Sequence, residues 1–162
     1  MLNPKSPLAD LLNARMRPGV VEWIGVRPIR RGPVSEVDSV VLDTQAGVVG
    51  DHYSNPKRGT RHVTLIQSED IAAIASYLDQ KVTPEQLRRN IVIRGLNLLA
   101  LKDKRFRLGE ALLQTTGECH PCSRMEETFG TGGHNAVRGH GGITARVLEG
   151  GVVRLSDYLT VA

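Results

Sequence analysis

Apolar residues occur in short runs along most of the chain, and turns that contain glycine or proline separate them. Runs of this length, rich in β-branched residues, are typical of β-strands. The strands that we expect cover residues 20–26, 34–42, 62–67, 90–95, 104–108, 111–116, 143–148 and 152–155. Gly109-Glu110 predicts a hairpin between two of them, and the turn at 149–151 predicts a second hairpin that closes the chain.

Helical spacing of apolar residues is clear in one place. The segment that starts at Ser68 repeats apolar positions about every third or fourth residue, at Ile71, Ile74, Ala75 and Leu78. Briefer helical segments are expected near 7–16, after Thr83-Pro84 and within 124–129. Many short strands without a strand-helix-strand rhythm favour a barrel or a sandwich. We therefore predict a mainly β fold, a closed or semi-closed β-barrel with one or two short helices.

The 162 residues suit a single domain, which we place at 20–162 after an N-terminal leader at 1–19. No apolar run is long enough to span a membrane, and the first residues do not resemble a secretion signal. Two cysteines do not make a disulfide framework, which favours a reducing, cytoplasmic compartment. Arginine outnumbers lysine by 16 to 5, and guanidinium groups suit oxoanions such as phosphate.

The two cysteines, Cys119 and Cys122, stand three residues apart in a loop that follows a predicted strand. Four interpretations remain open. The pair is half of a zinc site completed by histidines, a dithiol redox motif, or a site with one reactive thiolate at Cys122; otherwise the cysteines are buried and inert. Arg124 lies two residues beyond Cys122, and a nearby cation favours the thiolate form.

Other polar segments offer groups that bind anions. Residues 130–142 contain six glycines, which lead into a strand and allow backbone N–H groups to approach a ligand closely. Arg138 and His140 supply charge in this tract. The segment 50–52 and the Arg88-Arg89-Asn90 triple are further candidates. Few aromatic residues and no basic helix are present, so a nucleic-acid partner is not expected.

Taken in order, these segments resemble the MOSC domain, which is named for the C-terminal part of the molybdenum cofactor sulfurases. The resemblance rests on an ordered set that covers residues 20–158 and includes the stretches 47–52, 61–66, 89–96, 106–113, 121–126 and 139–151. The chain is similar to the small stand-alone bacterial members. The resemblance implies a barrel of the MOSC and pyruvate-kinase-barrel type that binds the molybdenum cofactor, a pterin dithiolene bearing a phosphate.

The family's cysteine falls on Cys122, which ligates molybdenum in members that act as reductases and has been proposed to carry sulfur in others. Cys119 is not part of the family pattern, and Arg89 stands where a Glu is common. We predict catalytic roles for Cys122, Asp51, His52 and Arg124, with Cys122 as the metal ligand. The predicted cofactor-binding residues are Arg61, Arg89, Asn90, Arg138, His140, Gly141 and Gly142.

The leading hypothesis is a molybdenum-cofactor oxidoreductase that reduces small N-hydroxylated compounds. The chain has no flavin or nicotinamide motif and too few cysteines for an iron–sulfur cluster, so it requires an electron-donating reductase as its partner. The alternative is a sulfur carrier with a persulfide on Cys122, or a cofactor-handling module without turnover of its own. The third hypothesis is a non-enzymatic barrel that binds anions or nucleic acid.

Overall fold

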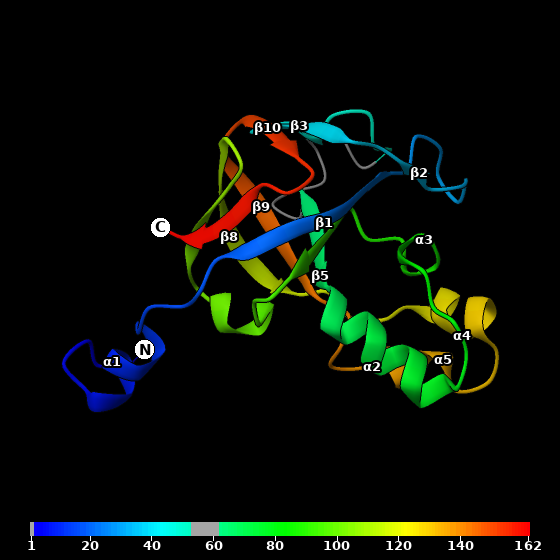
Figure 1. The fold of residues 1–162 in the computed structure, drawn as a ribbon, viewed down its shortest axis with the longest axis horizontal. Coiled ribbons are helices and arrows are strands. Elements are labelled where there is room, and N and C mark those ends of the chain that lie inside the picture. The colour runs from blue at the N-terminus through cyan, green and yellow to red at the C-terminus, as the bar shows by residue number, and fades with distance from the viewer. Residues whose placement is uncertain (1, 53–61) are drawn as a thin grey trace.

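The computed structural model describes residues 2–52 and 62–162, and Figure 1 shows their arrangement. Seven strands form a closed barrel in the order β11-β7-β8-β9-β5-β6-β1. Pairing of Gly19 with Leu159 and of Val20 with Tyr158 joins the last strand to the first. Their bounds are β1 Gly19–Val26, β5 Val63–Gln67, β6 Ile91–Arg94, β7 Arg105–Leu108, β8 Ala111–Glu118, β9 Ile143–Glu149 and β11 Tyr158–Val161. The prediction of a mainly β barrel is confirmed. Of the two predicted forms, closed and semi-closed, the structure has the closed one.

A small second sheet covers one end of the barrel. It consists of β10 (Gly151–Arg154), β3 (Ser39–Asp43) and β4 (Gly47–Val48), while β2 (Ser35–Glu36) pairs with the end of β1. The prediction of a closing hairpin is wrong, because β10 pairs with β3 instead of β9. A Cβ on Gly150 would lie 2.7 Å from the carbonyl oxygen of Leu42, so the glycine turn lets the chain cross to β3 at close range. The strand β11, which was not predicted, then closes the barrel.

The helices are more numerous than the sequence indicated. The described residues contain five α-helices: α1 Pro7–Leu12, α2 Ser68–Leu78, α3 Pro84–Leu87, α4 Ser123–Phe129 and α5 Gly133–Val137, with a 3₁₀ helix at Leu98–Leu101. Four of them span fewer than two helical turns, which is too short for an apolar period to stand out. Among the residues described, no helix combines the length and the apolar character that crossing a bilayer requires.

One strand-helix-strand unit is present, contrary to the sequence prediction. Strands β5 and β6 are parallel neighbours, and α2 and α3 form the crossover between them. The hairpin of β7 and β8 occurs at Gly109-Glu110 as expected. In α3, the Thr83 backbone N–H donates to the Gln86 side-chain oxygen at 2.9 Å, as the predicted capping box requires.

Two apolar clusters of described residues stabilise the fold. The first fills the barrel, and the second packs α2, α4 and α5 against its outer wall. Consecutive residues of β5 pack into different clusters, because successive side chains of a strand point to opposite faces. Leu65 belongs to the barrel cluster and Ile66 to the helical cluster. Figure 1 shows α2, α4 and α5 gathered beside the barrel, with α1 on the opposite side. The buried side chains of Met125 and Phe129 fix α4, and with it the residues that precede α4, against the barrel.

Candidate functional site

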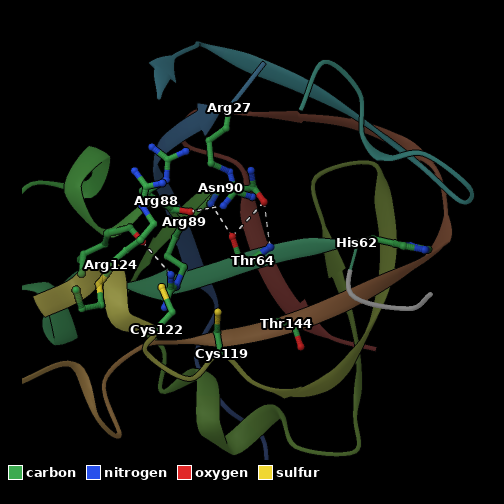
Figure 2. Close-up of a pocket in the computed structure, with 12 residues that line it drawn as sticks. Arg27, His62, Thr64, Arg88, Arg89, Asn90, Cys119, Cys122, Arg124 and Thr144 are labelled. Atoms are coloured by element: carbon green, nitrogen blue, oxygen red, sulfur yellow. Dashed lines mark hydrogen bonds between the residues drawn. The ribbon is translucent and has the colours of Figure 1, made fainter. Parts of the chain in front are cut away.

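A pocket of about 360 Å³ opens where the barrel meets the helices α3 and α4. Figure 2 shows its lining residues, which come from segments far apart in the sequence. Strand β1 leads into Arg27, the α3–β6 junction contributes three residues, and the loop between β8 and α4 contributes both cysteines. The lining is Arg27, His62, Thr64, Leu87, Arg88, Arg89, Asn90, Cys119, Cys122, Arg124, Met125 and Thr144.

Four arginines and no carboxylate are among the described residues that line this pocket. The Arg27 guanidinium fixes the neighbouring backbone, because its Nη1 donates to the Arg88 carbonyl oxygen at 2.7 Å. Arg88 has a positive φ of 59° where α3 ends, and its Nη1 donates to the Gly32 carbonyl oxygen at 2.7 Å. The clustered guanidinium groups favour a ligand with negative charge.

Arg89 presents a buried donor that no group in the described part of the chain satisfies. Its Nε donates to the Gly141 carbonyl oxygen and its Nη1 to the Leu87 carbonyl oxygen, both at 2.8 Å. Its third nitrogen, Nη2, is buried without a hydrogen-bond partner among residues 2–52 and 62–162, as is Nε of Arg124. A buried donor without a partner costs free energy. Two such donors on residues that line one pocket are therefore suited to an oxoanion.

Asp51, predicted to be catalytic, holds the wall behind the pocket. Its carboxylate accepts from the Arg27 backbone N–H at 2.7 Å, and from Arg27 Nε, Arg27 Nη2 and Asn90 Nδ2 at 3.3 Å each. The Asp51 side chain is only 1% exposed and does not line the pocket. These contacts join the end of β1 to the start of β6. The positions of Arg88 and Arg89, which precede β6, depend on this connection.

Asn90 and His52 belong to the same polar network. The Asn90 side-chain oxygen accepts from the backbone N–H and the hydroxyl of Thr64, both at 3.1 Å, so it ties β6 to β5. The His52 backbone N–H donates to the Arg27 carbonyl oxygen at 2.7 Å, and its ring Nδ1 lies 2.8 Å from the same oxygen. Asn90 lines the pocket, while His52 does not.

Both cysteines line the pocket as free thiols, Cys119 partly buried and Cys122 exposed. Neither cysteine is buried, contrary to the burial that the fourth interpretation assumes. Strand β8 changes register between Thr115 and Gly117, still pairs with β9 at Gly117 and Glu118, and then enters the loop. The Cys119 backbone N–H donates to the Gly142 carbonyl oxygen at 2.9 Å, which fixes the start of the loop. Cys122 ends it, directly before α4.

The predicted residues of the glycine-rich tract have different positions. Arg138 is exposed, and its Nη1 donates to the Asn135 side-chain oxygen at 3.3 Å. The ring of His140 lies between α2 side chains, with Nδ1 2.7 Å from Asp70 Oδ1 and Nε2 3.4 Å from the Tyr77 hydroxyl. Neither residue lines the pocket. Arg61 lies outside the described residues.

Gly141 and Gly142 support the pocket through their backbone. A Cβ on Gly141 would lie 2.1 Å from the Cys119 carbonyl oxygen and 3.2 Å from Arg89 Nη2, so only glycine lets these groups meet. The zinc interpretation has no support in the described part of the chain. There, no three His, Cys, Asp or Glu side chains are close enough together to hold a metal ion.

Sequence reasoning missed Arg27, Thr64 and Thr144 as pocket residues. Arg27 had one signal, since it opens a basic turn directly after a strand. Thr64 and Thr144 lie within β5 and β9, and no motif marks them. Their placement depends on the antiparallel register of these strands, in which the two threonines are paired.

The helix that follows Cys122 is held by an exposed carboxylate with a lowered pKa. Backbone N–H groups of His134 and Gly132 donate to Glu126 and lower its pKa. Because the folded-state pKa is the lower one, this contribution to stability is present above about pH 4.3 and is lost as the pH falls through the folded-state value. We expect Glu126→Gln to lower the thermal midpoint at pH 7 and to lower it less at about pH 3. Glu127→Gln, on the same helix, is the matched control, and an equal difference at both pH values would contradict the expectation.

Comparison with known proteins identifies the family. The MOSC domain model matches residues 46–160. The structure of the YuaD protein from Bacillus subtilis is similar at a TM-score of 0.79 and 18% identity, covering 90% of this chain and 96% of that one. YiiM from Geobacillus stearothermophilus has a TM-score of 0.68 and 18% identity, with 88% and 73% covered. YiiM from Escherichia coli has a TM-score of 0.67 and 20% identity, with 88% and 69% covered. A search of curated proteins found no match.

The match to the family model extends over more than half of the chain. The chain therefore belongs to the MOSC domain family, a family associated with the molybdenum cofactor.

Proposed function

We propose that the pocket binds the molybdenum cofactor and that the chain is an oxidoreductase for small N-hydroxylated compounds. The observation that supports this most strongly is the combination of donors on one pocket. The exposed Cys122 lines the same pocket as Arg89 and Arg124. Each of these arginines has a buried nitrogen without a partner in the part of the chain that the structure describes.

The donor set fits the two chemical ends of this cofactor. Thiolate is a soft ligand that suits a metal in dithiolene chemistry, so Cys122 is the proposed sulfur ligand to molybdenum. Guanidinium nitrogens suit phosphate, so Arg89 Nη2 and Arg124 Nε are the proposed phosphate donors. Gly141 keeps the wall beside Arg89 free of a side chain. When bound, the cofactor supplies two-electron redox chemistry, and the barrel positions it.

The reaction requires an external electron source. Reduction of R–NHOH to R–NH₂ consumes two electrons and two protons and releases one water molecule. The chain has no motif for a flavin or nicotinamide, and its two cysteines are too few for an iron–sulfur cluster. We therefore propose an electron-donating reductase as a partner, in a reducing cytoplasmic compartment.

Replacement of the proposed ligand tests this function. We expect Cys122→Ser, made in a host that produces the cofactor, to lose its molybdenum and to reduce an N-hydroxylated base about 100-fold more slowly or worse, since even residues around the ligands cost 10–100-fold. Turnover is measured with an artificial electron donor, and molybdenum by elemental analysis. Cys119→Ser is the matched control and should keep most of its molybdenum and most of its turnover. Equal rates for wild type and Cys122→Ser would exclude the ligand role.

The exposure of the Cys122 thiol favours one second candidate, a sulfur carrier. An exposed cysteine is accessible to a sulfur donor without a change in the fold. In that case Cys122 carries a persulfide, and the chain has no turnover of its own. This candidate would be favoured over the oxidoreductase if the wild type carried labile sulfane sulfur without molybdenum and Cys122→Ser carried no sulfane sulfur.

A further inference from the structure

The second thiol of the pocket has no role in the proposed function. Cys119 is partly buried and lines the same pocket as Cys122, and the chain contains no other cysteine. Figure 2 shows both sulfur atoms on the same side of the pocket, near the arginine side chains. The Cys-X-X-Cys spacing is one that dithiol–disulfide sites use.

The loop that joins the two thiols has no regular secondary structure. The segment 119–122 belongs to no helix or strand, and its two inner residues are His120 and Pro121. Backbone hydrogen bonds fix both ends of the loop. The Cys119 backbone N–H donates to the Gly142 carbonyl oxygen, and the Cys122 carbonyl oxygen accepts from the Met125 backbone N–H at 3.1 Å. A disulfide needs Cα atoms about 4.4–6.8 Å apart. Residues 119–122 form no turn in this structure, so closure requires the backbone of this loop to bend.

We propose that Cys119 and Cys122 form a reversible intramolecular disulfide after oxidation of Cys122 by a hydroperoxide. In the first step, the Cys122 thiolate attacks hydrogen peroxide, the O–O bond breaks, and a sulfenic acid and hydroxide form. In the second step, the Cys119 sulfur attacks the Cys122 sulfur, the S–O bond breaks, and water leaves. Together, two thiols lose two electrons and two protons, and one peroxide becomes two water molecules.

The exposures of the two residues assign the roles. Cys122 is the exposed residue and meets the oxidant first, whereas Cys119 is partly buried behind it as the resolving thiol. The disulfide engages the Cys122 sulfur and makes it unavailable to a soft metal or to sulfane sulfur. This inference does not depend on the proposed function, since it concerns the thiols of the chain alone.

Thiol counting on the full chain tests the proposal. Fully reduced protein is treated with hydrogen peroxide, its thiols are counted after denaturation, and its peptides are mapped by non-reducing mass spectrometry. We expect the wild type to lose both thiols together, to give one peptide linked between Cys119 and Cys122, and to recover both thiols with dithiothreitol. Because no other cysteine is present, the count reports on this pair directly.

The single variants separate the two steps. Cys119→Ser should stop at a sulfenic acid on Cys122, which dimedone traps and excess peroxide converts to the sulfinic acid. Cys122→Ser should keep its one thiol under the same treatment. A wild type that over-oxidises Cys122 while Cys119 stays reduced would overturn the proposal. Disulfide-linked dimers, or no oxidation of either thiol, would overturn it as well.

Discussion

Asp51→Ala is expected to lower the free energy of unfolding by about 3–5 kcal/mol, the usual cost of removing one partner of a buried ion pair. The carboxylate accepts from the backbone and the side chain of Arg27, and the two side chains are 1% and 9% exposed. Its removal leaves the guanidinium without this counter-charge in a place where water does not replace it. Urea unfolding followed by circular dichroism measures the change.

An exposed ion pair provides the control for Asp51. Arg107 Nη1 lies 2.8 Å from Glu149 Oε2, with both side chains about half exposed. Such a pair contributes about 0–1 kcal/mol, so Glu149→Ala should unfold close to the wild-type midpoint. If Asp51→Ala kept wild-type stability and lost only turnover, Asp51 would have the catalytic role that the sequence indicated, and the structural role would be refuted.

Gly142→Ala is expected to destabilise the fold by more than about 4 kcal/mol, an exceptional loss for one methyl group. Gly142 has a positive φ of 87°, and a Cβ there would lie 1.9 Å from the Leu65 carbonyl oxygen. Neither β5 nor the start of β9 can move away without breaking the barrel ladder between them. The Gly142 carbonyl oxygen also holds Cys119, so the pocket loop would be displaced with it.

The neighbouring Gly139 separates steric overlap from backbone strain. It also has a positive φ, 77°, but a Cβ there would meet nothing within 4 Å. Gly139→Ala should therefore cost only about 1–2 kcal/mol, the strain of a left-handed residue. Chemical denaturation of both variants gives the comparison. Equal losses would mean that the contact with Leu65 is relieved at no cost.

Local patterns in the sequence were sufficient for the barrel and for α2. Eight strands of the barrel and the second sheet lie where runs of apolar residues predict them, because alternation or continuous burial is a property of neighbouring residues. The same holds for α2, whose apolar residues extend over three turns. By contrast, α5 lies within the glycine-rich tract and has no such pattern. It forms where Gly133 allows contact with α4, since a Cβ there would lie 2.3 Å from the Met125 carbonyl oxygen.

The order of strands required distant contacts. The pairing of β10 with β3, and of β11 with β1, joins segments about 110–140 residues apart, a separation that no short pattern encodes. The parallel pairing of β5 with β6 joins residues such as Leu65 and Ile91, which are also farther apart than a local pattern extends.

The sequence by itself determined the family, the pair of cysteines in one loop and the abundance of arginine, because these depend on residue types and their order. Only the tertiary structure decided which residues face the pocket. It brought Arg27 and Cys119 to the lining, put Asp51 behind the wall, and directed His140 to Asp70 on α2. The physical reason is that a side chain's role depends on its burial and its partners, and both are set by packing between segments that are remote in the chain.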